Sequence, residues 1–129
     1  MHYFSYPKEE KLKSKKIIDS LFSDGKSVGK YPLRLVYVKH NFEENVPLKM
    51  GVSVSKKYFK KAVDRNYFKR VLRECYRLNK HLLTDNLEDK YCCMFFYQTK
   101  ERLTYPEINE KTKQLFEKFV KVIQEAEKG

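Results

Sequence analysis

Residues 62–80 constrain the fold most, because their charged and apolar side chains separate at helical spacing. At about 100° per residue, the charged arc spans roughly 140° and holds Arg65, Asn66, Lys69, Arg70, Arg73 and Arg77. The opposite arc holds Val63, Tyr67, Phe68, Val71, Leu72, Cys75 and Leu78. The pattern predicts a helix that packs on a core by one face and presents guanidinium groups to solvent on the other.

Positive charge is concentrated around that helix. The chain has 129 residues and a net charge of +11, and residues 49–80 carry eleven Lys and Arg against two acidic residues. Such concentration favours a surface built for a polyanion, with nucleic acid as the leading partner. A solvated helix face with incidental charges is less favoured. The face has few acidic partners at i,i+4, and it uses Arg, whose planar fork suits phosphate.

Length and composition predict one domain, residues 1–129, with flexible ends at about 1–10 and 126–129. The longest apolar stretch, Cys92 to Tyr97, is too short to span a bilayer, and the charged start has no signal-peptide region. A cytoplasmic protein is the default expectation. Three cysteines without a C-x-x-C pair, and three isolated histidines, indicate reduced thiols and no metal site.

The other elements follow from periodicity and capping residues. Strict alternation marks one strand, whose small Gly and Ser face either admits a ligand closely or is an ordinary exposed strand face. A capping box starts the last helix at Thr104 and Glu107. The expected elements are a helix over 14–23 capped by Ser14 and stopped by Gly25, strands over 33–39, 48–55 and 91–98, and a helix from 104 to near 128. This order predicts an α+β fold with helices covering a small sheet.

The run GVSVSKKYFKKAVDRNYFKRVLRE, residues 51–74, resembles the signature of the bacterial ribonuclease P protein subunit. The matching residues are Val54, Ser55, Lys56, Lys57, Ala62, Val63, Arg65, Asn66, Lys69, Arg70, Arg73 and Glu74. A weaker resemblance extends over roughly residues 11–120. Two positions depart from the family pattern: Tyr67 replaces an Arg, and Ile18 stands where many members carry an aromatic residue.

The resemblance implies a single αβββαβα sandwich like domain 2 of ribosomal protein S5, with a left-handed βαβ crossover. It also implies two RNA partners. The basic helix would bind the catalytic RNA, and a cleft between the first helix and the sheet would hold the 5′ leader of precursor tRNA. The RNA subunit would perform the cleavage with Mg²⁺. The protein would bind no tight cofactor, no DNA and no membrane, and would be inactive as a nuclease alone.

The candidate RNA-binding residues are Lys56, Lys57, Lys60, Lys61, Arg65, Asn66, Lys69, Arg70, Arg73 and Arg77. The candidate leader-cleft residues, implied by the resemblance, are Ile18, Phe22, Val36 and Ser53. Alternatives stay open at three places: Phe22 as a core residue, Asn66 as a backbone-bonding residue, and Tyr58 and Phe59 as further RNA contacts.

No catalytic residue or metal ligand is assigned, because no acidic cluster or paired histidine suggests one. The resemblance therefore implies a subunit of an endoribonuclease, and a ribosomal-type structural RNA-binding protein is the alternative.

Overall fold

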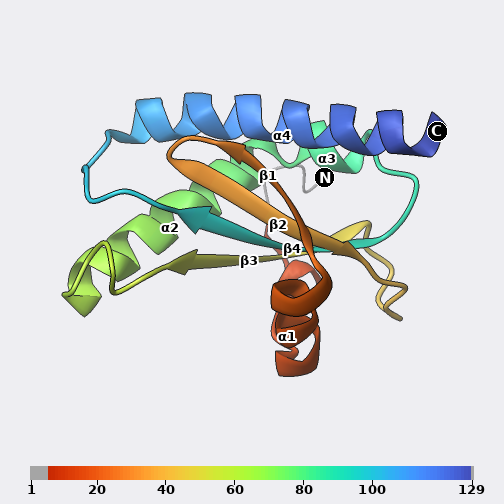
Figure 1. The fold of residues 1–129 in the computed structure, drawn as a ribbon, viewed down its shortest axis with the longest axis horizontal. Helices are drawn as coiled ribbons and strands as arrows, with labels where there is room; N and C mark the ends of the chain where they lie inside the picture. Colours follow the sequence, from red (N-terminus) through yellow and green to blue (C-terminus); the bar gives the residue numbers. More distant parts are fainter. Residues whose placement is uncertain (1–5, 129) are drawn as a thin grey trace.

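The computed structural model describes residues 6–128, which form a mixed α+β fold in the order predicted (Figure 1). Its elements are η1 Lys8–Glu10, α1 Lys15–Asp24, β1 Lys26–Lys30, β2 Leu33–Lys39, β3 Leu48–Val54, α2 Ala62–Asn79, α3 His81–Thr84, β4 Tyr91–Tyr97 and α4 Tyr105–Lys128. Apart from the short helices η1 and α3, this is the αβββαβα arrangement that the resemblance implied. The α+β fold class is confirmed.

The strands form one sheet in the order β1-β2-β4-β3. The pairs β1–β2 and β2–β4 are antiparallel, whereas β3 and β4 are parallel. Parallel neighbours require a crossover connection, and α2 provides it. The apolar β4 lies inside the sheet, as its composition predicted, and β3 lies at an edge. The left-handedness of this crossover stays a prediction.

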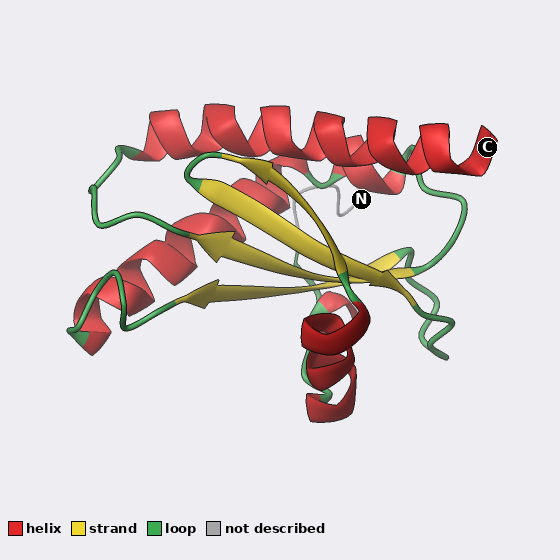
Figure 2. Ribbon diagram, viewed as in Figure 1, coloured by secondary structure: helices red, strands yellow, loops and turns green. Residues whose placement is uncertain are grey.

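Helices cover the two faces of the sheet unequally (Figure 2). The long helices α2 and α4 lie on one face, and the ten-residue α1 lies on the other. Side chains along β4 alternate between the two sides. Cys93 and Phe95 enter the larger hydrophobic cluster under α2 and α4, while Cys92 and Met94 enter the smaller cluster beside α1.

Both predicted helix caps are confirmed. The Ser14 hydroxyl accepts a hydrogen bond from the Ile17 N–H, at 3.4 Å. At α4 the Thr104 N–H donates to the Glu107 carboxylate at 2.9 Å, and the Glu107 N–H donates to the Thr104 hydroxyl at 3.3 Å. These reciprocal bonds satisfy backbone donors that a helix start leaves without partners.

Two residues near the start of α2 differ in burial from what the sequence suggested. Val63, placed on the apolar arc, is 71% exposed, and α2 begins beyond the end of β3 (Figure 1). Phe59 is only 7% exposed, and its ring stacks on Phe68 with centroids 4.7 Å apart, so its ring belongs to the core. The flexibility expected for residues 1–10 and 126–129 falls partly outside the described residues and stays a prediction.

Candidate nucleic-acid interface

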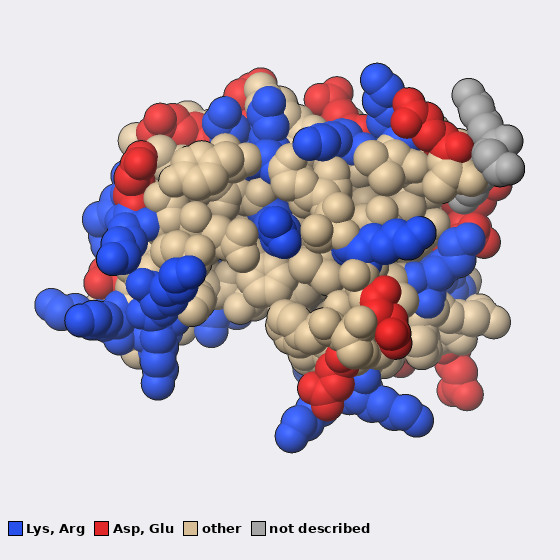
Figure 3. All heavy atoms as spheres, in the orientation of Figure 1, with Lys and Arg blue, Asp and Glu red and all other residues tan. Residues whose placement is uncertain are grey.

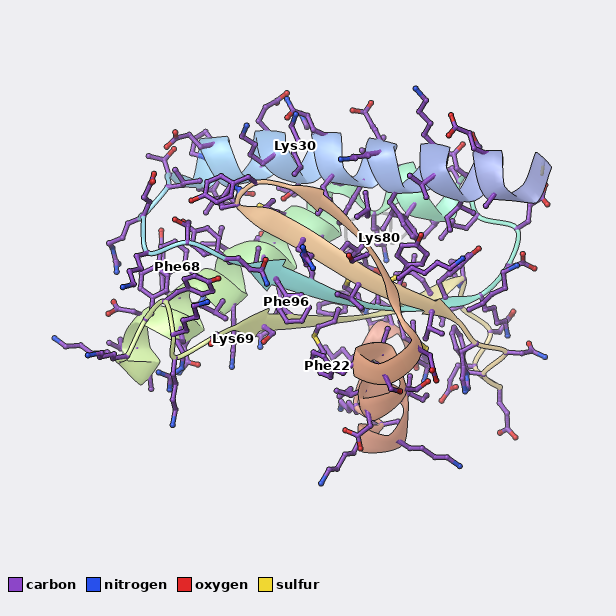
Figure 4. The ribbon with its side chains drawn as sticks, in the orientation of Figure 1. Phe22, Lys30, Phe68, Lys69, Lys80 and Phe96 are labelled. Atoms are coloured by element: carbon purple, nitrogen blue, oxygen red, sulfur yellow. The ribbon has the colours of Figure 1, made fainter. Side chains whose placement is uncertain are left out.

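The basic face of α2 projects from a firmly packed helix. The buried residues of its other face are Phe68, Val71, Leu72, Cys75, Tyr76 and Asn79. On the outer side Asn66, Arg70 and Arg73 are exposed, while Lys69 is half-buried. Lys and Arg gather at the end of the molecule where α2 begins (Figure 3), and Lys69 extends away from the core there (Figure 4). The helix therefore holds its cations in fixed positions at the surface.

The loop that leads into α2 adds four exposed lysines: Lys56, Lys57, Lys60 and Lys61. Its conformation is held by Arg65, whose Nη1 donates to the Phe59 carbonyl at 3.0 Å and to the Lys60 carbonyl at 2.7 Å. The Ser55 hydroxyl also accepts a hydrogen bond from the Lys57 N–H, at 3.1 Å. Arg65, predicted as a phosphate contact, thus positions the basic loop as well.

Arg102 fixes the start of α2, a role that sequence reasoning missed. Its guanidinium lies over the rings of Phe59 and Phe68, at 5.8 and 5.3 Å from the ring centroids. It also bonds the Asp64 carboxylate at 3.1 Å, so the one acidic residue in the first turn of α2 is paired. The pairing leaves the cations around the helix start as the dominant charge there.

The far end of α2 is less cationic than the sequence suggested. Arg77 forms an ion pair with Glu74 at 2.7 Å, and the hydrogen bond that its guanidinium donates to the Glu74 carboxylate raises the pKa of Arg77. Lys80, counted in the basic segment, is buried against Glu10. The exposed positive surface is therefore concentrated in the first half of the helix and in the loop before it.

The structure shows the surroundings of Asn66 and Tyr67, two positions on α2 whose roles the sequence left open. Asn66 is exposed, and within residues 6–128 its side chain makes no hydrogen bond, so it does not fix the helix start. Tyr67 is 42% exposed, with its ring edge-on to Phe68 at 5.0 Å. The tyrosine thus places an aromatic ring beside the basic face, where the family pattern has a cation.

The predicted cleft residues lie on the α1 side of the sheet. Phe22 is 65% exposed, and its ring meets Phe96 edge-to-face at 6.2 Å (Figure 4). Ile18 and Val36 are half-buried beside the smaller hydrophobic cluster. Ser53 pairs with Phe96 in the sheet register, which brings it to the same area. The four residues thus lie on the same face of the sheet, Phe22 and Ser53 beside Phe96 and Ile18 and Val36 beside Met94, and Phe22 is not a core residue.

Phe96 and Arg34 lie beside the predicted cleft residues, and sequence reasoning missed both. Arg34 is exposed and pairs with Phe96 across β2 and β4. The signal was present in the alternation along β4, because Phe96 must point away from its buried neighbours Phe95 and Tyr97. The exposed Phe22 ring and the half-buried Phe96 ring lie beside this arginine. Together they form a surface on which an unpaired base could stack.

A groove of ≈ 450 Å³, called here the edge groove, lies at the edge strand β3, and the predicted cleft residue Ile18 is part of its lining. Gly51 lies on its floor. A Cβ at that position would lie 3.0 Å from the Met94 side chain, so glycine lets Met94 pack against the backbone of β3. The lining residues are Tyr6, Lys11, Leu12, Lys13, Ile18, Met50, Gly51, Val52, Arg73 and Met94. The groove therefore joins the α1 side of the sheet to the basic face of α2.

The described part of the chain provides neither a metal-binding cluster nor a membrane-spanning helix. Residues 6–128 contain no group of three or more His, Cys, Asp or Glu that could hold a metal ion. In the same range no helix has both the length and the apolar character needed to cross a membrane. The site is thus made of cations, aromatic rings and a groove.

Comparison with known proteins agrees with this arrangement. The family model described as Ribonuclease P matches residues 6–120. The ribonuclease P protein component of Porphyromonas gingivalis is 41% identical over 102 residues, which cover 78% of this chain and 74% of that protein. Its counterpart in Dictyoglomus thermophilum is 35% identical over 88 residues, covering 68% and 70% of the two chains.

Solved structures show the same fold at lower identity. The RNase P protein from Thermotoga maritima superposes with a TM-score of 0.68 at 24% identity, covering 84% of this chain and 96% of that one. A Staphylococcus aureus RNase P protein gives 0.63 at 23% identity, covering 82% and 91%. The family match over most of the chain and the curated relatives above 30% identity together establish that this chain belongs to the ribonuclease P protein family.

Proposed function

We propose that this protein is the protein component of a bacterial ribonuclease P and assists removal of the 5′ leader from precursor tRNA. The observation that carries the proposal is the array of exposed Lys and Arg on the 55–61 loop and the first half of α2, fixed by a buried helix face. Substrates of this enzyme are transcripts, so the proposal places the protein in the cytoplasm. The family match does not favour the ribosomal-type alternative.

In this proposal the α2 surface docks on the catalytic RNA. Arg70, Arg73 and Lys69 contact phosphates, and the loop lysines extend the contact. Each neutralised phosphate releases condensed counterions, so affinity falls steeply with salt. Arginine suits this task because its fork binds phosphate oxygens in pairs.

The cleft around Phe96 holds the leader in the same proposal. Single-stranded RNA binds where bases stack on aromatic rings and cations follow the backbone. Phe22 and Phe96 offer the rings, Arg34 offers a cation, and Ser53 and Val36 line the floor. This surface requires no particular base sequence, which suits leaders that differ between precursors.

Cleavage is assigned to the RNA. Metal-assisted phosphodiester hydrolysis needs ligands that hold divalent ions at the reacting phosphate. Since the described residues offer no such acidic cluster, the proposal places Mg²⁺ on the RNA and gives the protein no tightly bound cofactor. The protein alone is then inactive as a nuclease, and neither DNA nor a membrane is among its partners.

The experiment that tests this proposal is multiple-turnover cleavage of a precursor tRNA at low magnesium by the cognate catalytic RNA. It is run with the protein, without it, and with the protein alone. Stimulation only in the combination supports the proposal. A folded protein that binds the RNA tightly yet gives no stimulation contradicts it, and cleavage by the protein alone contradicts the assignment of the chemistry to RNA.

The double variant Arg70→Ala/Arg73→Ala tests the docking surface. It should weaken binding to the catalytic RNA and reduce the slope of log affinity against log salt by roughly 0.9 per lost contact. Both residues are exposed, so the melting temperature should stay nearly unchanged. Lys113→Ala/Lys121→Ala on α4 removes the same charge from exposed positions and serves as the control. Equal effects of the two pairs would show that only net charge matters.

A further inference from the structure

Residues 6–13, called here the strap, are held along the edge of β3. The Tyr6 ring packs edge-on against Tyr76 at 5.1 Å, and the Tyr6 hydroxyl donates to the Met50 carbonyl. The Leu12 N–H donates to the same carbonyl at 3.2 Å, and Lys11 pairs with Met50 as an isolated parallel bridge. The strap therefore extends the sheet for a short distance beyond its edge strand.

A buried ion pair anchors the strap to the end of α2. Glu10 and Lys80 are each 6% exposed, and the Lys80 ammonium lies 2.9 Å from a Glu10 carboxylate oxygen. The Tyr76 hydroxyl donates to the same carboxylate at 2.6 Å. Burial, together with the nearby Glu10 charge, raises the pKa of Tyr76, so its hydroxyl stays protonated and keeps donating. Such a pair is tolerated in the interior only when its hydrogen bonds are satisfied, as they are here.

This anchor changes the charge that the strap presents to solvent. Glu10 is neutralised inside the protein by Lys80, so Glu9 is the one exposed acidic residue between positions 8 and 16. The same stretch exposes Lys8, Lys11, Lys13, Lys15 and Lys16. None of these five lysines forms an ion pair within residues 6–128. The strap and the start of α1 thus form a second cationic tract, separate in sequence from α2.

The position of this cationic tract indicates which class of ligand it binds. Lys11 and Lys13 line the edge groove from the strap, and Arg73 lines it from α2. Ile18 and Met94 line the same groove where it meets the leader cleft. The half-buried Tyr6 ring also lines the groove, and the Lys11 ammonium lies over it at 5.5 Å from the ring centroid, which holds this lysine at the groove. Cations along a groove with an aromatic surface are what a single-stranded nucleic acid backbone requires.

We propose that the strap binds the phosphates of leader nucleotides upstream of those held in the cleft, along the edge groove, with Lys11 and Lys13 as the principal contacts. This inference rests on the proposed function, because it extends the path of the same leader. It has one distinctive consequence: the strap contributes to binding only when the leader is long enough to leave the cleft and reach the edge of β3.

The test uses the holoenzyme assembled from the cognate catalytic RNA and the full-length protein. Two precursor tRNAs are compared, one with a leader that fills only the cleft and one with a leader several nucleotides longer. Lys11→Gln/Lys13→Gln should weaken binding of the long-leader precursor several-fold. The salt slope for that precursor should fall by about 1.4, the value for two contacts on a single strand. Binding of the short-leader precursor and of the catalytic RNA should not change.

Lys113→Gln/Lys121→Gln on α4 is the matched control, since both residues are exposed and lie outside the groove. Equal weakening for the two leader lengths would overturn the proposal, because the strap would then contact another part of the complex. No weakening for either precursor would also overturn it. An unchanged melting temperature shows that the variant is folded. If the wild-type protein fails to stimulate cleavage at all, it is the proposed function that fails, and this result is seen before any variant is compared.

Discussion

The two faces of the sheet differ in how completely helices cover them. On the α2 and α4 face, Phe95 and Phe116 are fully buried in one continuous cluster. On the α1 face a short helix covers only part of the sheet, and Phe22 and Phe96 remain partly open to solvent. Alternate residues of the same strand, β4, serve both faces. The difference indicates that stability comes mainly from one face and that the other keeps apolar surface available for a ligand.

Neighbouring phenylalanines on β4 test this division most strongly. Phe95→Ala should lower the free energy of unfolding by about 3–5 kcal/mol, because it leaves a cavity in a closed core. Phe96→Ala should cost only about 1 kcal/mol, because that side chain is half-buried and water already reaches it. Urea denaturation of the two variants gives both values. Similar losses would show that the α1 face is as much a core as the other.

Phe22 tests the open face directly. Phe22→Ala should weaken binding of a precursor with a leader by about 1–3 kcal/mol, the range for a stacked base. Unfolding should change little, since the ring is already 65% exposed. Leaderless mature tRNA is the control substrate, and its binding should not change. A large loss of stability with unchanged leader binding would make Phe22 a packing residue and would remove the functional half of the comparison.

Most of the fold could be predicted because each segment carries its own signal. The α2 helix begins at Ala62 as its periodicity predicted, and the capping box at Thr104 marks the start of α4. β1 was not located from its residues, because Lys26–Lys30 has a single buried side chain, Val28, and so no alternation. Its place is set by antiparallel pairing with β2, which is a tertiary effect.

The candidate site was predictable where charge and exposure coincide along one helix. The wheel placed Arg70 and Arg73 correctly on the exposed face, but it had no means to show that Lys80 is buried with Glu10, seventy positions away. The strap was missed for the same reason. Its lysines look unremarkable in sequence, and only the fold shows that they line a groove with Arg73.

Cys92 and Cys93 are adjacent in sequence but lie on opposite faces of the sheet, so their thiols compare the two faces at neighbouring positions. Burial raises the pKa of Cys92, on the α1 side, to about 11, and it raises the pKa of Cys93, under α2 and α4, still further. As pH rises above 9, an unfolded chain loses these protons while the folded chain keeps them. Each thiol therefore lowers the free energy of unfolding by at most about 1.4 kcal/mol per pH unit until its folded pKa is reached.

Iodoacetamide reacts with thiolates, and both thiols are fully buried, so each one reacts only when the face that covers it opens. At pH 10 Cys92 should be alkylated before Cys93, because it holds more thiolate and lies on the less covered face. Mass spectrometry of peptides after timed alkylation separates the two sites when Cys92→Ala and Cys93→Ala are analysed in parallel. Modification of both thiols at one rate would mean that they react only through global unfolding, and the two faces would then open together.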